Sequence, residues 1–367
     1  MKSTSEQEYL DSAFSGRPDI LAEGAAGWQS PSNIAIVKYW GKYGNQLPMN
    51  PSLSFTLSAA RTETTLTFRP KESKGISLQF SFEGKPNPPF ADKIHKFLTG
   101  IEPFFPFLAS VDLNISSHNT FPHSSGIASS ASSMSALVLC LLDMEQQLSG
   151  QVLYESDFLR KASYFSRLAS GSASRSVFPY ASVWGKSEAV TGSSQEFAVP
   201  AERILHHEVR DMRDSILIVH SGTKSVSSRA GHALMENNPF SETRYALAHQ
   251  NLGHLTKALS EGDLDAFVRI TEEEAMQLHA LMMTSRPSYL LIEPQTVAVI
   301  QAVRRFRKEQ HIPICFTLDA GPNVHLLYPG RYADEVHTFI REELLQFCTD
   351  GRWIDDRAGS GPGRIAP

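Results

Sequence analysis

The chain has 367 residues, of which 41% are hydrophobic and 20% are charged, and its formal net charge is -5. This composition is typical of a globular protein long enough for two domains, and it excludes a disordered chain. The mildly acidic balance gives no reason to expect nucleic acid as a partner. An anionic substrate would therefore need locally placed Lys and Arg side chains.

The N-terminal residues and the thiols lead us to expect a cytoplasmic protein. Residues 1–18 are polar and lack the apolar core of a signal peptide. No apolar run approaches the roughly 18 residues that would span a bilayer, so we expect no membrane partner. The cysteines are too few and too scattered for a disulfide framework or a zinc site, and no side chains are singled out as metal ligands. They are Cys140, Cys315 and Cys348.

The first half of the chain is predicted to contain a loose leader, residues 1–20, followed by a domain over residues 21–203. Alternating apolar residues indicate strands, and apolar residues at helical spacing indicate helices, with Gly150 as a stop signal. The expected strands lie around residues 34–36, 53–57, 76–82 and 111–115, and the expected helices span 127–148 and 155–168.

The second half, residues 204–367, is predicted to form another domain. The boundary is placed near residues 186–203, where the chain turns polar and loses its periodicity. Expected strands span 215–219, 314–318 and 324–327, and expected helices span 245–259, 264–283, 295–309 and 332–348. Strands mixed with helices, without strict alternation, favour an α+β fold in two domains.

A segment of small residues, 122–131, lies between an expected strand and an expected helix. It reads ProHisSerSerGlyIleAlaSerSerAla. Free N–H groups and the positive end of the helix dipole would bind phosphate at such a helix start. A Ser-capped helix packed closely on a sheet explains the same residues, so both interpretations stay open. The segment is not a Walker motif, because GxxxxGK[ST] occurs nowhere in the chain.

Lysines and arginines next to hydroxyl groups mark three further segments. Lys38 and Lys42 flank Tyr39, Trp40 and Gly41 at the end of an expected strand, and they could present cations to phosphate or carboxylate. On that segment alone, an edge strand with solvated lysines is favoured. Hydroxyls accompany an arginine in residues 170–176 and again in 226–229, although surface loops often have this composition.

Asp319 ends an apolar strand and precedes a Gly-Pro turn. A carboxylate there commonly caps the turn through neighbouring N–H groups. It could instead act in a cleft as a base or as a group that orients a hydroxyl.

Together these segments resemble the diphosphomevalonate decarboxylases, a branch of the GHMP kinase superfamily. The resemblance covers residues 33–328, with the motifs in family order. They are AsnIleAlaIleValLysTyrTrpGlyLys at 33–42, ProMetAsnProSerLeuSer at 48–54, ArgLeuAlaSerGlySerAlaSerArgSer at 167–176 and AspAlaGlyProAsn at 319–323.

The resemblance implies a two-domain α+β fold with the active site in the cleft between the domains. The N-terminal domain would be like ribosomal protein S5 domain 2, and the C-terminal domain would be ferredoxin-like. The implied partners are ATP with Mg²⁺, mevalonate 5-diphosphate and a second copy of the chain in a homodimer. The products would be isopentenyl diphosphate, CO₂, ADP and phosphate.

Residue roles follow from the resemblance where the motifs agree. Asp319 would orient or deprotonate the C3 hydroxyl, Lys38 would neutralise charge beside it, and Arg175 would hold the substrate carboxylate. Positions expected around the substrate are Tyr39, Trp40, Gly41, Lys42, Ser170, Gly171, Ser172, Ser228 and Arg229. Positions expected around the ATP phosphates are Pro122, Ser124, Ser125, Gly126, Ser129 and Ser130. Mg²⁺ would be coordinated mainly by the ATP phosphates.

Some features leave alternatives open. Pro179 and Tyr180 replace a Gly-Gly pair of the family, and His279 lies in a segment that resembles a family helix near the substrate but receives no role. A decarboxylase of mevalonate 5-phosphate and a mevalonate 3-kinase are the nearest alternatives. The intact pair of Lys38 and Asp319, together with Arg175, favours decarboxylation over a pure kinase and over a non-enzymatic binding module.

Overall fold

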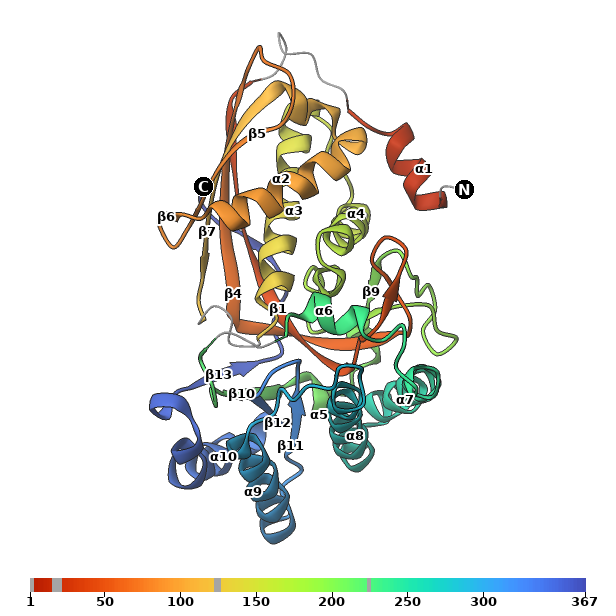
Figure 1. Cartoon of the computed structure of the whole chain (residues 1–367), viewed down its shortest axis with the longest axis vertical. Coiled ribbons are helices and arrows are strands. Elements are labelled where there is room, and N and C mark those ends of the chain that lie inside the picture. The colour runs from red at the N-terminus through yellow and green to blue at the C-terminus, as the bar shows by residue number, and fades with distance from the viewer. Residues whose placement is uncertain (1–2, 15–21, 122–126, 223–225) are drawn as a thin grey trace.

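Two sheets follow one another along the long axis of the molecule (Figure 1). The computed structural model describes residues 3–14, 22–121, 127–222 and 226–367. The first sheet has the strand order β14–β1–β4–β7–β5–β6, with β8 paired to β4 and β9 to β8. Its strands are β1 Gly24–Val37, β4 Ser52–Pro70, β5 Ser77–Phe82, β6 Lys85–Pro86, β7 Val111–Asn119, β8 Ala181–Trp184, β9 Ala198–Pro200 and β14 Gly363–Arg364.

Helices cover one face of this sheet (Figure 1). They are α2 Pro88–Ile101, α3 Ser129–Ser149 and α4 Glu155–Ala169. Serines on α3 allow a close approach to the sheet: Ser135 Oγ lies 2.6 Å from Ser30 Oγ, and Ser132 Oγ lies 2.7 Å from Thr62 Oγ1. These two serines therefore have the structural role that the small-residue interpretation predicted.

The second sheet has the order β11–β12–β10–β13, and its neighbouring strands run antiparallel. Its strands are β10 Met212–Leu217, β11 Cys315–Leu318, β12 Val324–Pro329 and β13 Trp353–Arg357. The helices of this part are α5 His207–Arg210, α6 Ser228–Ala233, α7 Ser241–Glu261, α8 Leu264–Met283, α9 Pro294–Gln310 and α10 Ala333–Phe339. The second and third strands of this half, β11 and β12, are adjacent, and the first, β10, lies between β12 and the fourth, β13. This is the ferredoxin-like order that was expected.

The two halves of the chain share an apolar core. Phe55 on β4 lies 6.0 Å from Phe267 on α8, measured between ring centroids. The Asp356 carboxylate on β13 accepts N–H groups from the β4 backbone at residues 58–60, at 2.7 to 2.8 Å. The last strand, β14, returns to pair with β1 in the first sheet. These contacts set the two sheets in one arrangement and leave the cavity described below between them.

The expectation of a loose leader over residues 1–20 is wrong for its helical part. Residues Thr4–Asp11 form α1, with Ser3 as the N-cap that accepts the Glu6 N–H at 3.1 Å. Tyr9 is buried, with its ring centroid 4.9 Å from that of Tyr164 on α4. Burial of this aromatic ring on a distant helix stabilises α1, although its own sequence is mostly polar.

The expected closing helix at 332–348 is shorter than predicted. Regular α-helix ends at Phe339. A π-helical turn follows over Ile340–Leu344, and a 3₁₀ turn covers Leu345–Phe347. This irregular winding places Ile340 and Leu344 in the apolar core beside the second sheet.

Candidate active site

A cavity of about 600 Å³ lies where the two halves of the chain meet. This volume is typical of a small-molecule site. Its walls come from the residues after β1, the first turn of α3, the connection after α4, helix α6 and the residues after β11. The predicted site residues that line it are Lys38, Tyr39, Trp40, Lys42, Ser130, Ser170, Gly171, Ser172, Arg175, Ser228, Arg229 and Asp319.

The remaining predicted site residues do not line this cavity or are not described. Pro122, Ser124, Ser125 and Gly126 lie outside the described residues. Ser129 begins α3 and lines a neighbouring pocket.

Gly41 is part of the support of the site rather than its wall. Its φ of +94° favours glycine, and a Cβ there would collide with the Tyr245 ring and hydroxyl. Its N–H donates to His232 Nδ1 at 2.9 Å.

Lys38 and Asp319 meet although 281 positions separate them in the sequence. The distance from Lys38 Nζ to Asp319 Oδ1 is 3.9 Å, and their side chains are 1% and 28% exposed. Lys38 Nζ also donates to the Ala35 carbonyl. Burial lowers the pKa of Lys38 to about 8, and the negative charge of Asp319 is the largest effect that opposes this. The lysine is therefore not the solvated one that its segment alone favoured.

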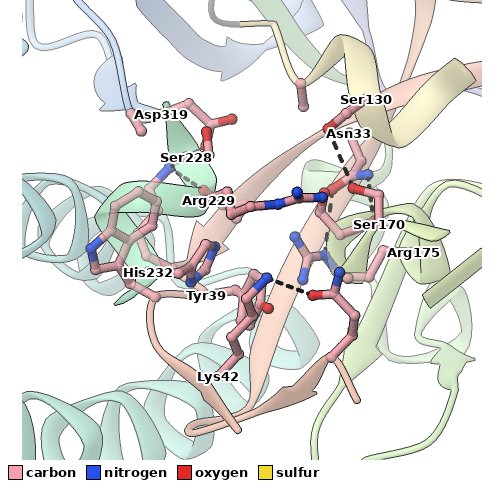
Figure 2. Close-up of a pocket in the computed structure, with 18 of the residues that line it drawn as sticks. Asn33, Tyr39, Lys42, Ser130, Ser170, Arg175, Ser228, Arg229, His232 and Asp319 are labelled. Atoms are coloured by element: carbon pink, nitrogen blue, oxygen red, sulfur yellow. Dashed lines mark hydrogen bonds and ion pairs between the residues drawn. The ribbon is translucent and has the colours of Figure 1, made fainter. Parts of the chain in front are cut away.

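Asp319 has its backbone anchored from two directions. Its carbonyl accepts the Gly321 N–H at 2.8 Å and lies 3.1 Å from His279 Nε2 on α8. This contact places His279, which the sequence singled out without a role, against the backbone of the predicted catalytic Asp319. The Asp319 side chain itself faces the cavity (Figure 2).

Arg175 ends the 3₁₀ helix Gly171–Arg175 and is buried. Its Nη1 donates to Ser52 Oγ at 2.7 Å, and its guanidinium carbon lies 5.8 Å from the Trp184 ring centroid. Burial lowers its pKa to about 10, while the Asp319 charge acts in the opposite direction. The guanidinium thus stays cationic at neutral pH and is held rigidly at the cavity wall.

Positive charge dominates the described wall of the cavity. Five cationic side chains, Lys38, Lys42, Lys93, Arg175 and Arg229, surround one carboxylate, Asp319. Burial and the charge of Arg229 lower the pKa values of Lys42 and Lys93. A bound polyanion would relieve this crowding, because each cation would gain an opposite charge. The cavity therefore contains the local Lys and Arg side chains that we expected for an anionic substrate in a mildly acidic protein.

Sequence reasoning missed several lining residues, among them Asn33, Gln46, Lys93 and His232. His232 could have been found from its position three residues after Arg229 on one helix. Its ring lies 4.5 Å from those of Tyr39 and Trp40, and burial lowers its pKa to about 3. It is therefore a neutral imidazole that accepts from Gly41 at Nδ1. Lys93 comes from α2, for which no motif gave a signal.

The start of α3 fits a phosphate group. Ala128 occupies the N-cap in the left-handed region, with φ +42°, and has no side-chain acceptor to offer the first N–H groups. Ser130 Oγ lies 3.3 Å from Ser170 Oγ across the cavity (Figure 2). This arrangement supports the phosphate interpretation of the segment for its described residues.

A smaller pocket adjoins the cavity between α2, α3 and the first sheet. It shares Lys93 and Ser130 with the cavity and presents the aromatic rings of Phe80, Phe82 and Phe90. A flat apolar group attached to a polyphosphate could therefore occupy this pocket while its phosphates reach the start of α3.

The two substituted residues Pro179 and Tyr180 are not among the described lining residues of the cavity. Tyr180 has φ +56°, a conformation that glycine adopts at no steric cost, and its ring lies 4.8 Å from the Arg210 guanidinium carbon.

The donor set suits magnesium that is held mainly by phosphates. Within the described residues, no three His, Cys, Asp or Glu side chains gather as they would around a metal ion. One carboxylate, several hydroxyls and the side-chain amides of Asn33 and Gln46 are oxygen donors among the lining residues, and Mg²⁺ commonly keeps few protein ligands beside phosphate oxygens and water. Over the same described ranges, none of the helices is both long and apolar enough for a membrane span.

Both halves of the chain match known protein domains. Residues 30–196 match the diphosphomevalonate decarboxylase-like N-terminal domain, and residues 215–355 match the mevalonate 5-diphosphate decarboxylase C-terminal domain. Diphosphomevalonate decarboxylase ERG19 of Gibberella zeae is 30% identical over 323 residues, which are 83% of this chain and 81% of that protein. Phosphomevalonate decarboxylase of Haloferax volcanii is 26% identical over 336 residues, 90% of this chain and 94% of that protein.

A solved structure has the same fold. MDDEF in complex with MVAPP, AMPPCP and magnesium gives a TM-score of 0.78 at 27% identity, and the match covers 94% of this chain and 100% of that one. The expected two-domain α+β arrangement of the GHMP type is thereby confirmed. Matches over both halves, and a 30% identical relative covered over four-fifths of its length, show that this chain belongs to the diphosphomevalonate decarboxylase family.

Proposed function

We propose that this chain catalyses the ATP-dependent decarboxylation of mevalonate 5-diphosphate to isopentenyl diphosphate, with release of ADP, phosphate and CO₂. The observation that carries the proposal is the contact between Lys38 and Asp319 at 3.9 Å, in a cationic cavity that also contains Arg175. A carboxylate, a lysine and an arginine are the groups that the reaction needs at its centre. Family membership supports the same conclusion.

The first step is transfer of the ATP γ-phosphoryl group to the C3 hydroxyl. A tertiary alcohol is a weak nucleophile and hydroxide is a poor leaving group, so the oxygen must be phosphorylated before it departs. Phosphoryl transfer requires positioning and neutralisation of charge more than covalent help. Asp319 orients the hydroxyl and accepts its proton, and the Lys38 ammonium offsets the charge of the transferred group.

The second step breaks two bonds in the substrate. The C3–O bond breaks as phosphate leaves with its electron pair, and the C–C bond to the carboxylate then supplies electrons for the new double bond. Arg175 binds the carboxylate and orients it while CO₂ forms. Its bonds to Ser52 and Asn33 hold the guanidinium in one place as the carboxylate loses its charge.

The nucleotide is proposed to occupy both pockets, with its adenine in the smaller pocket and its phosphates in the cavity. The adenine ring would contact Phe80, Phe82 and Phe90, and the phosphates would reach the first turn of α3 at Ser129 and Ser130. Lys93 lines both pockets and would contact the phosphate chain. Magnesium, when bound with ATP, neutralises phosphate charge.

A second candidate is the decarboxylation of mevalonate 5-phosphate. The matched phosphomevalonate decarboxylase, which this chain covers over 94% of its length, favours considering it. The distinction depends on whether a second phosphate gains contacts in the cavity. Lys42 and Arg229 are cations that line the cavity and would contact a second phosphate (Figure 2).

A side-by-side assay with mevalonate, its 5-phosphate and its 5-diphosphate tests the proposal. Each reaction contains ATP and magnesium, and ADP and CO₂ are both measured. Equal release of ADP and CO₂ from the diphosphate alone is the expected result. ADP without CO₂ would mean a kinase, and preference for the monophosphate would establish the second candidate.

Three further features are proposed. A homodimer is proposed on the family resemblance, a cytoplasmic location on the few scattered cysteines, and a division of the chain between residues 203 and 204 on the loss of apolar periodicity before it. Light scattering after size-exclusion chromatography measures the first. The third falls inside the short 3₁₀ helix Glu202–Ile204, which links the two sheets.

A further inference from the structure

Three side chains hold the backbone of Lys38 on both sides, and two of them, Glu274 and Arg244, come from the second half of the chain. Its N–H donates to Glu274 Oε2 on α8 at 2.8 Å. Its carbonyl accepts from Asn50 Nδ2 at 2.9 Å and from Arg244 Nη2 on α7 at 3.5 Å. Lys38 follows the last residue of β1, so strand pairing does not fix its backbone there. These contacts take over that task.

The Glu274 carboxylate is fully buried, and both of its oxygens accept hydrogen bonds. Glu274 has an exposed side-chain fraction of 0%, and Arg244 one of 3%. Arg244 binds both Glu274 oxygens, and Asn251 Nδ2 donates to Oε1 at 2.7 Å. A buried ion pair is costly to form unless its hydrogen bonds are satisfied, and it adds little net stability compared with apolar packing. Its presence beside the predicted catalytic lysine therefore points to a positional role.

We infer that Glu274, held by Arg244, is a positioning residue that fixes Lys38 relative to Asp319 across the cleft. The inference rests on the proposed function. Lys38 directly follows β1 of the first sheet, whereas Asp319 directly follows β11 of the second sheet. The bonds from α7 and α8 tie Lys38 to the half of the chain that carries Asp319. They thereby set the 3.9 Å separation at which the lysine offsets the charge of the transferred phosphoryl group.

Glu274 also acts on the lysine through its charge. The charged groups that influence Lys38 are Asp319, Glu274 and Asp214, which favour its protonated form, and Arg175, which opposes it. Replacing Glu274 with a neutral residue removes one favourable charge. Lys38 would then lose its proton at a lower pH than it does in the wild type.

Substitutions at Glu274 separate the two effects. E274Q removes the negative charge and weakens the ion pair with Arg244. E274D keeps the charge, but its side chain is one methylene shorter and cannot reach the Lys38 N–H in the same way. Glu272 on the same helix offers a matched control, because it is a buried glutamate bonded to Arg304 and Arg307 and does not contact Lys38. E272Q therefore tests the loss of a buried carboxylate charge on α8 without affecting the site.

The measurement is kcat and KM for ADP and CO₂ release between neutral pH and about pH 10. For E274Q, we expect the alkaline limb of kcat to move to lower pH by roughly half a unit or more, with kcat reduced on the order of tenfold and KM for ATP little changed. For E274D, we expect a reduced kcat with the limb in its wild-type place. E272Q should match the wild type in both.

Several outcomes would overturn the inference. The first is an E274Q enzyme whose kcat and whose alkaline limb of the pH profile of kcat are both unchanged. The second is an E272Q enzyme whose alkaline limb moves as far as that of E274Q. If E274Q fails to fold, which a thermal melt would show, a wild-type kcat in E274D would be decisive against it. Lack of CO₂ release by the wild-type chain would remove the proposed function and this inference together, whereas an active wild type with an unaffected E274Q removes the inference alone.

Discussion

Replacing Lys38 with methionine should abolish activity and at the same time stabilise the fold at neutral pH. Burial lowers the pKa of this lysine from 10.5 to about 8. Each pKa unit corresponds to about 1.4 kcal/mol, so the charged ammonium costs the native state about 3 kcal/mol. Methionine has a similar length and no charge, but it leaves the Ala35 carbonyl without its donor, at a cost of about 1 to 2 kcal/mol. A net gain of about 1 to 2 kcal/mol in the free energy of unfolding remains.

The pH dependence gives this prediction its sign. At neutral pH the lysine is protonated in both the folded and the unfolded state, so the folded wild type bears the full cost of the buried charge. Above about pH 8 the folded state releases the proton while the unfolded state keeps it up to about 10.5. Wild-type stability therefore rises across that interval relative to the variant, because the unfolded state binds more protons.

Urea unfolding of the wild type and K38M, at neutral pH and again near pH 10, measures both effects. The advantage of methionine should be largest at neutral pH and shrink as the pH rises. A variant that is less stable than the wild type by the same amount at both pH values would refute the reasoning, because it would show that the buried ammonium carries no cost. The exposed Lys257 offers a control, since K257M should leave stability unchanged at both pH values.

Three further predictions concern single positions. D319N should abolish turnover while AMPPCP binding, measured by calorimetry, survives, and near-normal turnover would remove Asp319 from the mechanism. G171A should lower the free energy of unfolding by about 1 to 3 kcal/mol and raise KM for the substrate, because a Cβ there would lie 2.8 Å from the Trp184 ring and 2.9 Å from the Tyr39 hydroxyl. Y9A should destabilise the chain by about 3 kcal/mol in thermal unfolding, since it removes the buried contact of α1; a kcat that fell with it would contradict a purely structural role for that helix.

Several elements could be predicted because their signal is local. The expected helix at 264–283 has the bounds of α8 in the structure, since its apolar spacing and its Asp263 N-cap lie within one short segment. The expected strand at 314–318 corresponds to β11 for the same reason. The leader failed as a prediction because α1 depends on Tyr164, more than 150 positions away. Local periodicity cannot report a partner of that kind.

The residues that carry the chemistry of the site likewise lie in short motifs, and the family was identified from these motifs. Residue type alone shows that Lys38, Arg175 and Asp319 can bind anions or orient a hydroxyl. It does not show that Lys38 is buried, which decides its pKa, or that Asp319 lies beside it. No sequence motif indicated the contributions of Lys93 and Glu274. Burial and distance depend on which remote segments pack together, and only the tertiary structure decided them.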